Sequence, residues 1–472
     1  MSLAGLFGLT LPLSNGGCAA ESRKPGRPNI LFIVADDLGY ADLSCYGRRD
    51  ISTPHIDRLA ADGVRFTQAY ANSSVCSATR TALITGRYQY RLRVGLEEPV
   101  RDKPGIGLPP EHPTLPSLLK KQGYKTALIG KWHLGPLPDF GPLKSGYERF
   151  YGIRGGGVDY YLHTGTDHKK DFWDGDVPIE KQGYMTDLLG DRAVELVNAM
   201  APGPFFMSLH FNAPHWPWEA PGGDDSEARR LNDRSLFHFD GGSPKIFKQM
   251  VERLDYQVGR VLLALEGRGL REDTIVIFTS DNGGERFSDT WPFTGRKTEL
   301  LEGGLRIPAI VRWPKSIAGG RTHDQVTISM DWLPTLLAAA GTTPDPGFTP
   351  DGMSVLPALT SNAAPVPRQL FWRYKANKQR AARAGDFKLL KILDNTFLFN
   401  VVEDPMERAN LKERHRDVYD RMVGEWNAWN GTMLPEVRES ETGGFKGAEL
   451  ADHIGTPDSS GGEVDEGTEW PK

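Results

Sequence analysis

Short apolar runs that end abruptly in polar residues or glycine are the feature that most constrains how this chain can fold. Five of them are spaced along the sequence, within residues 29–39, 125–133, 204–215, 274–284 and 306–314. Amphipathic helical patterns lie between them, at residues 114–123, 188–200 and 247–269. Continuous apolar strands that alternate with helices are typical of a parallel sheet covered on both faces. The pattern predicts an α/β fold with a large mixed, mostly parallel, doubly wound sheet flanked by helices.

The pattern changes near residue 365, where short strands replace the strand and helix alternation. Strands are expected within residues 369–375, 379–392 and 395–405, and a helix at 411–429. These indicate a small antiparallel sheet with one helix. The predicted division is a leader at 1–27, an α/β domain at 28–364, a subdomain at 365–430 and an extended tail at 431–472, which is rich in Gly, Ser, Glu and Thr.

Composition and the N-terminal segment limit the partners of the chain. The formal net charge of -5 comes from 56 basic and 61 acidic residues without a long block of either sign, so no nucleic-acid-binding footprint is expected. Three cysteines are too few for a disulfide framework. The first 27 residues hold a short apolar run followed by small residues, which resembles a secretory signal and predicts a periplasmic or secreted protein. No stretch is long enough for a transmembrane segment.

Acidic and amide side chains follow two of the predicted strands. Asp36 and Asp37 come after the first apolar run, and Asp281 and Asn282 come after the run at 274–280. Three carboxylates and an amide at one sheet edge would repel one another unless a divalent cation lay among them, and oxygen ligands favour Ca²⁺ or Mg²⁺. Each pair alone is explained as well by a helix cap or a turn. Together the two pairs favour a metal site.

Basic side chains follow other strands. Strand alternation would place Lys131 and His133 on one side and Trp132 on the other, although a solvated strand end explains the same spacing. His215 lies between prolines after a further strand, and Lys297 lies in a loop. A single His or Lys of this kind is usually structural or solvated.

Cys76 is expected near the start of a helix, in the stretch SSVCSATRTALITGR. Ser73, Ser74 and Ser77 are candidate caps and Gly86 is the expected end of the helix. A helix N-terminus and Arg80 one turn later would lower the pKa of the thiol and make it reactive. The alternative is a buried, inert cysteine.

The stretch CSATRTALITGR resembles the signature of the type I sulfatases, in the alkaline phosphatase superfamily, whose cysteine is oxidised to Cα-formylglycine. The similarity continues, in family order, through the segments PNILFIVADDLGYADLSCYG, TPHIDRLAADGVRFTQAY, GKWHLG, FNAPHWPW, SDNGG, GRKTELLEGGLRIP and DPMERANL. It covers nearly the whole chain outside the first ~27 and last ~40 residues, a span longer than a typical domain. The order of the motifs makes the resemblance specific.

The resemblance implies a nucleophile made from Cys76 by a formylglycine-generating maturase, with the hydrated aldehyde attacking sulfur. It implies Ca²⁺, with Mg²⁺ as the other candidate ion, held by Asp36, Asp37, Asp281, Asn282 and the modified Cys76. It also implies that Arg80 stabilises the modified residue and that His133 hydrogen-bonds it. Lys131 and Lys297 would hold the sulfate oxygens, and His215 would lie near the leaving oxygen.

The function predicted in this way is hydrolysis of an O-sulfate ester of an aryl alcohol or a carbohydrate. Two alternatives stay open: a phosphonate or phosphate ester hydrolase of the same superfamily, and a protein that binds sulfated glycans without cleaving them because Cys76 is not matured. Tyr160, Tyr161 and Trp173 in the loop at 152–175 would form a sugar-stacking rim, or the loop would have a small core of its own. His210 either lines the pocket or satisfies a core hydrogen bond, and the second interpretation is favoured.

Overall fold

The computed structural model describes residues 27–101, 103–165, 168–199, 203–223, 241–361, 363–440, 442–443 and 470. The predicted leader, up to residue 26, and most of the predicted tail lie outside the described residues. Within the described part of the chain, no helix combines the length and the hydrophobicity needed to cross a bilayer.

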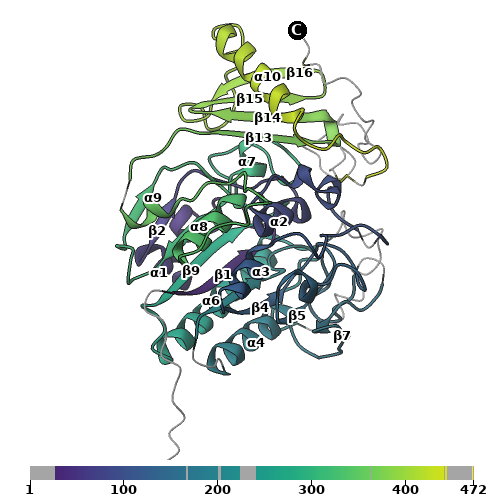
Figure 1. Ribbon diagram of the computed structural model, residues 1–472, viewed down its shortest axis with the longest axis vertical. Coiled ribbons are helices and arrows are strands. Elements are labelled where there is room, and N and C mark those ends of the chain that lie inside the picture. The colour runs from purple at the N-terminus through teal and green to yellow at the C-terminus, as the bar shows by residue number, and fades with distance from the viewer. Residues whose placement is uncertain are drawn as a thin grey trace, which may run out of the picture.

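Parallel strands form the centre of a large mixed sheet (Figure 1). In spatial order they are β9 (Thr274–Ser280), β1 (Asn29–Ala35), β8 (Phe205–His210), β4 (Lys125–Gly130) and β5 (Arg149–Gly152). The first four of them are the strands predicted from the apolar runs that end in the candidate site residues. β1 is buried along its whole length, as expected for a strand covered on both faces.

Shorter strands extend the sheet at both edges. Beyond β9 lie β10 (Ala309–Arg312), β2 (Val64–Phe66) and β11 (Arg321–His323), and beyond β5 lie β6 (Trp173–Asp174) and β7 (Val177–Pro178). β10 runs antiparallel to both of its neighbours, and so does β6. A separate parallel pair is formed by β3 (Ala69–Tyr70) and β12 (Thr327–Ile328). The predicted mixed α/β sheet is therefore confirmed.

Helices cover the two faces of the large sheet, and alternate residues of β1 divide between the two cores. Leu31 and Ile33 pack in the core under α1 (Pro54–Ala61), α4 (Met185–Ala199) and α6 (Pro244–Gly267). Phe32 and Val34 pack in the opposite core, to which α2 (Cys76–Thr85), α3 (Leu115–Lys121), α8 (Trp332–Ala339) and α9 (Leu356–Thr360) contribute. This doubly wound arrangement leaves the carboxyl ends of the central strands as the place for a site.

The strand register sets which residues meet at that edge. Ala35 pairs with Ser280, so the residues that follow β1 and β9 leave the sheet side by side. His210, at the end of β8, pairs with Val34 on one side and with Gly130 on the other. The segments that follow β9, β1, β8 and β4 therefore emerge next to one another.

A small antiparallel sheet follows, with one helix, as predicted. It consists of β13 (Gln369–Tyr374), β14 (Gln379–Ala384), β15 (Phe387–Ile392) and β16 (Asn395–Asn400), followed by α10 (Arg416–Asn430). The segment 379–392 is a hairpin of two strands, which turns at Gly385, where φ is 60°. The helix begins five residues later than expected because the chain makes turns up to His415.

The small sheet packs on the large domain. Figure 1 shows it at the top of the view, with α7 (Glu302–Leu305) and α2 below it. The Trp372 indole Nε1 donates a hydrogen bond to the Ala71 carbonyl at 2.9 Å, and its ring lies 5.4 Å from that of Tyr70. Val75 and Ala78 belong to the same apolar core as Trp372. The two parts therefore share a core directly behind the start of α2.

Candidate active site

All the predicted site residues come together at the carboxyl edge of the large sheet. Asp36 and Asp37 follow β1, Lys131 and His133 follow β4, and the remaining residues come from four other segments, namely His215 after β8, Asp281 and Asn282 after β9, Lys297 before α7, and Cys76 and Arg80 on α2. Ligand atoms of Asp36, Cys76 and Asp281 lie within 4.8 Å of one another. The same holds for Asp36, Asp37 and His215.

Each buried carboxylate of the cluster is paired with a cation. The pairs are Asp36 Oδ2 with Lys131 Nζ at 2.6 Å, Asp37 Oδ2 with Lys297 Nζ at 2.5 Å, and Asp281 Oδ2 with the Arg80 guanidinium at 2.9 Å. These three pairs balance the charges of the carboxylates. The carboxylates still repel one another, as expected, since the charges of Asp281 and Asp37 both raise the pKa of Asp36. The fold offsets this repulsion in part with three cations from distant segments.

The donor atoms nevertheless suit a metal ion. Asp36 Oδ1 and Asn282 Oδ1 are buried and have no hydrogen-bond partner among the described residues, although buried polar atoms normally have one. Burial raises the pKa of Asp36 well above its usual value, and Lys131 only partly offsets this effect. A cation that bound these oxygens would give them a partner and would also offset the cost of burying the charged Asp36 carboxylate. The cluster can therefore hold a metal ion, and its oxygens are hard donors.

Cys76 is the first residue of α2 and is 2% exposed. None of the predicted serine caps is correct, since Val75 occupies the N-cap position without a side-chain hydrogen bond, and Ser77 instead accepts from the Val100 N–H at 2.8 Å. Gly86 ends the helix with φ 68°, as predicted. Burial raises the pKa of the thiol, and this effect outweighs the opposing charges of Lys131 and Lys297. The predicted lowering of the thiol pKa is therefore wrong.

The hydrogen bonds of His133 define the tautomer of its imidazole. Nε2 lies 2.9 Å from the Val100 carbonyl, which can only accept, so Nε2 carries the proton. Nδ1 then presents a lone pair to Cys76 Sγ at 3.3 Å. Burial, and then the charge of Lys131, lower the pKa of His133 well below its usual value. A neutral imidazole therefore faces the side chain of residue 76.

Lys131 and His133 both reach the site while Trp132 points away, but strand alternation is not the reason. β4 ends at Gly130, and the following backbone is held by hydrogen bonds from Lys131 N to the His210 carbonyl at 2.8 Å and from His133 N to the Arg154 carbonyl at 3.0 Å. His133 has a positive φ of 57°, which is uncommon for a residue other than glycine. Backbone pairing with neighbouring segments therefore determines the direction of the His133 side chain.

His215 has the opposite tautomer. Its Nδ1 donates to the Trp216 carbonyl at 2.6 Å, which leaves the Nε2 lone pair 3.6 Å from Asp37 Oδ2. Burial, and then the charges of Lys297 and Lys131, lower the pKa of His215 well below its usual value. Both histidines of the cluster are therefore neutral near pH 7.

His210 lies against Arg80 of the site, so the alternative that it lines the site agrees with the structure better than the favoured core position. Its Nδ1 lies 3.3 Å from the Arg80 guanidinium and 3.4 Å from the Lys131 carbonyl, and its Nε2 has no hydrogen-bond partner among the described residues. Burial, and then the charge of Arg80, lower the pKa of His210 to about 3. The expected core hydrogen bond is present on one nitrogen only. The strand position of His210 signals burial, and only the fold places it against Arg80.

The loop at 152–175 contacts the site through glycines that the sequence analysis did not single out. A Cβ at Gly156 would lie 2.9 Å from two ring atoms of His133, and one at Gly157 would lie 2.9 Å from His215 Cε1. Tyr160 has no exposed surface, and its hydroxyl donates to the His215 carbonyl at 2.9 Å. The predicted role of Tyr160 in a sugar-stacking rim is therefore wrong. The alternative of a separate small core is also wrong, because Val158, Tyr160 and Phe172 belong to the same core as Leu31 and Ile33. The glycines of the loop lie against both histidines.

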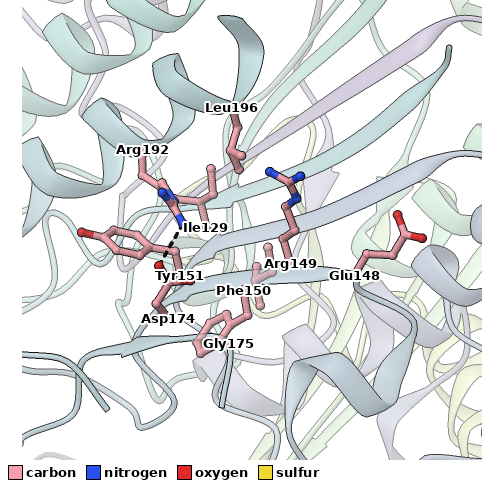
Figure 2. Close-up of a pocket in the computed structure, with 10 residues that line it drawn as sticks. Ile129, Glu148, Arg149, Phe150, Tyr151, Asp174, Gly175, Arg192 and Leu196 are labelled. Carbon is pink, nitrogen blue, oxygen red and sulfur yellow. Dashed lines mark hydrogen bonds and ion pairs between the residues drawn. The ribbon is translucent and has the colours of Figure 1, made fainter. Parts of the chain in front are cut away.

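A cavity of about 250 Å³ lies elsewhere, along β4, β5 and α4 (Figure 2). No predicted site residue lines it. Arg192 crosses it to form an ion pair with Asp174 at 2.9 Å, the contact drawn as a dashed line in Figure 2. This cavity is therefore distinct from the cluster around Cys76.

Comparison with known proteins assigns the chain to a family. The model of the sulfatase family matches residues 28–342, and the model of the C-terminal region of N-sulphoglucosamine sulphohydrolase matches residues 295–427. The chain belongs to the sulfatase family, whose members are sulfuric ester hydrolases.

Individual relatives agree with this assignment. Arylsulfatase A of Homo sapiens is 34% identical over 398 residues, which cover 76% of this chain and 74% of that protein. N-acetylgalactosamine-6-sulfatase of Canis lupus familiaris is 31% identical over 409 residues, which cover 80% of this chain and 74% of that protein. Among solved structures, Ps i-CgsB superposes with a TM-score of 0.76 at 31% identity, covering 85% of this chain and 92% of that one. The same protein has been solved in complex with k-i-k-neocarrahexaose.

Proposed function

We propose that this protein hydrolyses the O-sulfate ester of a carbohydrate or an aryl alcohol, with residue 76 as a formylglycine hydrate and with Ca²⁺ in the acidic cluster. The observation that supports this most directly is the gathering of Asp36, Asp281 and a neutral His133 around Cys76. Membership of the sulfatase family supports the reaction, and the neocarrahexaose complex of a relative supports a carbohydrate substrate.

The residues that would hold Ca²⁺ are Asp36, Asp37, Asp281, Asn282 and residue 76. Their oxygens suit a hard cation, and the Oδ1 atoms of Asp36 and Asn282, which have no hydrogen-bond partner among the described residues, support this assignment over a purely structural cluster. When bound, the ion supplies positive charge that stabilises negative charge developing during the reaction. Mg²⁺ is the other candidate.

The state of Cys76 supports its conversion to formylglycine. Burial keeps the thiol protonated, and a protonated thiol is a poor nucleophile. The hydrate of an aldehyde carries two hydroxyls, so one can attack sulfur and displace the alcohol. When the other then loses its proton, the carbon expels inorganic sulfate and the aldehyde is regenerated. A formylglycine-generating maturase is therefore the proposed partner. Export to the periplasm or the medium is the proposed location, and it rests on the pattern of residues 1–27.

The remaining residues have roles that follow from their contacts. His133 Nδ1 is placed to take a proton from a hydroxyl of residue 76, since Nε2–H is held by the Val100 carbonyl. Arg80 orients Asp281 and lies one turn from residue 76. Lys131 and Lys297 bring two positive charges to where the sulfate oxygens would lie, in a site that excludes water. His215 would lie near the leaving oxygen.

The test combines peptide mass and turnover, on protein purified from its native host. Formylglycine lowers the mass of the peptide containing Cys76 by about 18 Da, from the stoichiometry of converting a thiol into an aldehyde. We expect this loss, and turnover of sulfate esters that exceeds turnover of the matched phosphate esters. An unmodified thiol with binding but no cleavage of sulfated glycans would contradict the proposal, and so would a large preference for phosphate or phosphonate esters.

A further inference from the structure

Glu285 is a buried carboxyl next to the site that the proposed reaction does not use. It follows Asp281 and Asn282 in the loop after β9 and is 6% exposed. Neither of its carboxylate oxygens has a hydrogen-bond partner among the described residues. A buried acceptor left without a donor costs about 1 to 3 kcal/mol, and more when it is charged, so its presence needs an explanation.

The surroundings of Glu285 place it beside Lys297. The Lys297 backbone N–H donates to the carbonyl of Gly284 at 3.0 Å, so the backbones of the two segments are adjacent. The strongest charge acting on the Glu285 carboxyl is that of Lys297, followed by that of Asp37. Lys297 Nζ is already bound to Asp37, at 2.5 Å. The nearest cation of the site is therefore engaged elsewhere.

Glu285 also lies on the outer side of the cluster. Asp36, Asp281 and Asn282 have no exposed surface, whereas Glu285 retains 6% and Lys297 retains 8%. A substrate that delivers its sulfate group to the buried residues must leave its alcohol part on the side where exposure remains. Both oxygens of the Glu285 carboxyl are themselves buried, so the carboxyl is an unfilled acceptor at the less buried margin of the cluster, on the side of the alcohol part of the substrate.

We propose that Glu285 is a specificity-determining residue that accepts a hydrogen bond from a hydroxyl or N–H group of the substrate close to the sulfated oxygen. This inference rests on the proposed function and narrows it. Sugars carry several hydroxyl groups, and N-acetylated sugars also an N–H, whereas the ring of an aryl sulfate such as nitrophenyl sulfate carries neither. The residue therefore selects a sulfated carbohydrate, because a site built to bind a donor discriminates against substrates that lack it.

The experiment compares two kinds of substrate on matured enzyme. kcat/KM is measured for N-acetylgalactosamine 6-sulfate, for sulfated neocarrahexaose and for nitrophenyl sulfate, in the wild type and in Glu285→Leu and Glu285→Gln. In Glu285→Leu, the ratio of the better sugar to nitrophenyl sulfate should fall about tenfold or more, as expected for a lost hydrogen bond to a charged group. Glu285→Gln keeps one acceptor oxygen, so its ratio should lie between those of the wild type and Glu285→Leu. Glu272→Gln is the matched control, because that side chain is 65% exposed.

Three results would overturn the inference. An equal fall on all substrates would mean that Glu285 acts only through Lys297. An unchanged ratio in Glu285→Leu would mean that it contacts no substrate donor. Wild-type enzyme that cleaves nitrophenyl sulfate but neither sugar would leave the proposed function standing and remove the role of Glu285, whereas matured protein that cleaves no sulfate ester would refute the proposed function itself. Thermal unfolding of each variant shows that it is folded.

Discussion

The side chains around Cys76 are charged or polar, and nearly all of them are buried. Their protonation states follow from burial and from partners that come from other segments. His133 and His215 are neutral with opposite tautomers, because the Val100 carbonyl accepts a hydrogen bond from Nε2 of His133 and the Trp216 carbonyl accepts one from Nδ1 of His215. At this scale, the proposed roles depend on which atom of each residue faces residue 76.

Replacing His133 tests the proposed proton acceptor. His133→Ala should lower kcat for a sulfate ester by about 100-fold or more, because a positioned general base contributes about 10² to 10⁴ in rate. The measurement is kcat and KM on protein whose formylglycine content has been verified by mass. His415→Gln, at a half-buried position in the C-terminal subdomain, is the control. A variant with formylglycine and wild-type kcat would refute the role.

His210 should make stability depend on pH. Its pKa is lowered to about 3 in the fold and is about 6.5 in an unfolded chain, so between these values the unfolded state binds more protons and stability falls as pH falls. At pH 5 the cost is about 2 kcal/mol relative to neutral pH. The free energy of unfolding is measured for wild type and His210→Gln from pH 7.5 to 5. The wild type should lose about this amount relative to His210→Gln, which lacks the titrating group. Parallel curves would contradict the prediction.

At the scale of elements, the loop before α7 shows how distant segments position one side chain. Thr298, next to Lys297, has a positive φ of 72°, and its N–H donates to the Ser74 carbonyl at 2.9 Å. Gln379 at the start of β14 donates to the Thr298 carbonyl at 2.9 Å and accepts from the Leu300 N–H at 2.7 Å. A side chain of the C-terminal sheet therefore holds the loop that carries Lys297.

Gln379→Leu should loosen this loop. We expect kcat/KM for sulfate esters to fall by about tenfold, because a small displacement of a charged group from its working position is costly. Inhibition by inorganic sulfate should weaken in parallel if Lys297 binds sulfate. Gln379→Glu keeps the acceptor for the Leu300 N–H, so its kcat/KM should fall less than that of Gln379→Leu. A lower melting temperature with unchanged kcat/KM and sulfate inhibition would show that Gln379 only stabilises the fold.

At the scale of the whole molecule, the C-terminal sheet and the large domain are joined by a buried ionic cluster. Lys388 on β15 lies 3.0 Å from Glu302 on α7 and 2.9 Å from Glu407, and these three side chains have no exposed surface. Burial would raise the pKa of Glu302, but Lys388 and the neighbouring arginines lower it overall. The boundary proposed at residues 364 and 365 marks a change in the sequence pattern. It does not separate two hydrophobic cores, because the two parts share one.

Removing this lysine should destabilise the entire protein. Lys388→Met leaves the buried Glu407 without its cation and leaves Glu302 with its ion pair to Arg306, which should cost about 3 to 5 kcal/mol. Because the core is shared, chemical denaturation should still show one transition. Lys315→Met, which breaks a pair at the surface, should change stability by less than about 1 kcal/mol. Two separate transitions in the wild type would mean that the two parts fold independently.

The sequence by itself determined the strands and the residues that end them. The apolar runs before Asp36, Lys131 and Asp281 predict both the sheet and its functional edge, because period and polarity are local properties of the chain. The motif around Cys76 identified the family. The turn inside 379–392 and the later start of α10 were not visible, because the apolar pattern does not mark strand and helix ends sharply.

Only the tertiary structure decided how the site residues are paired and protonated. It supplied cations for the three carboxylates, raised the pKa of the Cys76 thiol instead of lowering it, buried Tyr160 and brought the backbone at Gly284 and Glu285 next to Lys297. The physical reason is that desolvation and hydrogen bonding depend on segments 50 or more residues apart, as with Cys76 and His133, which are separated by 57 positions. No local pattern carries that information.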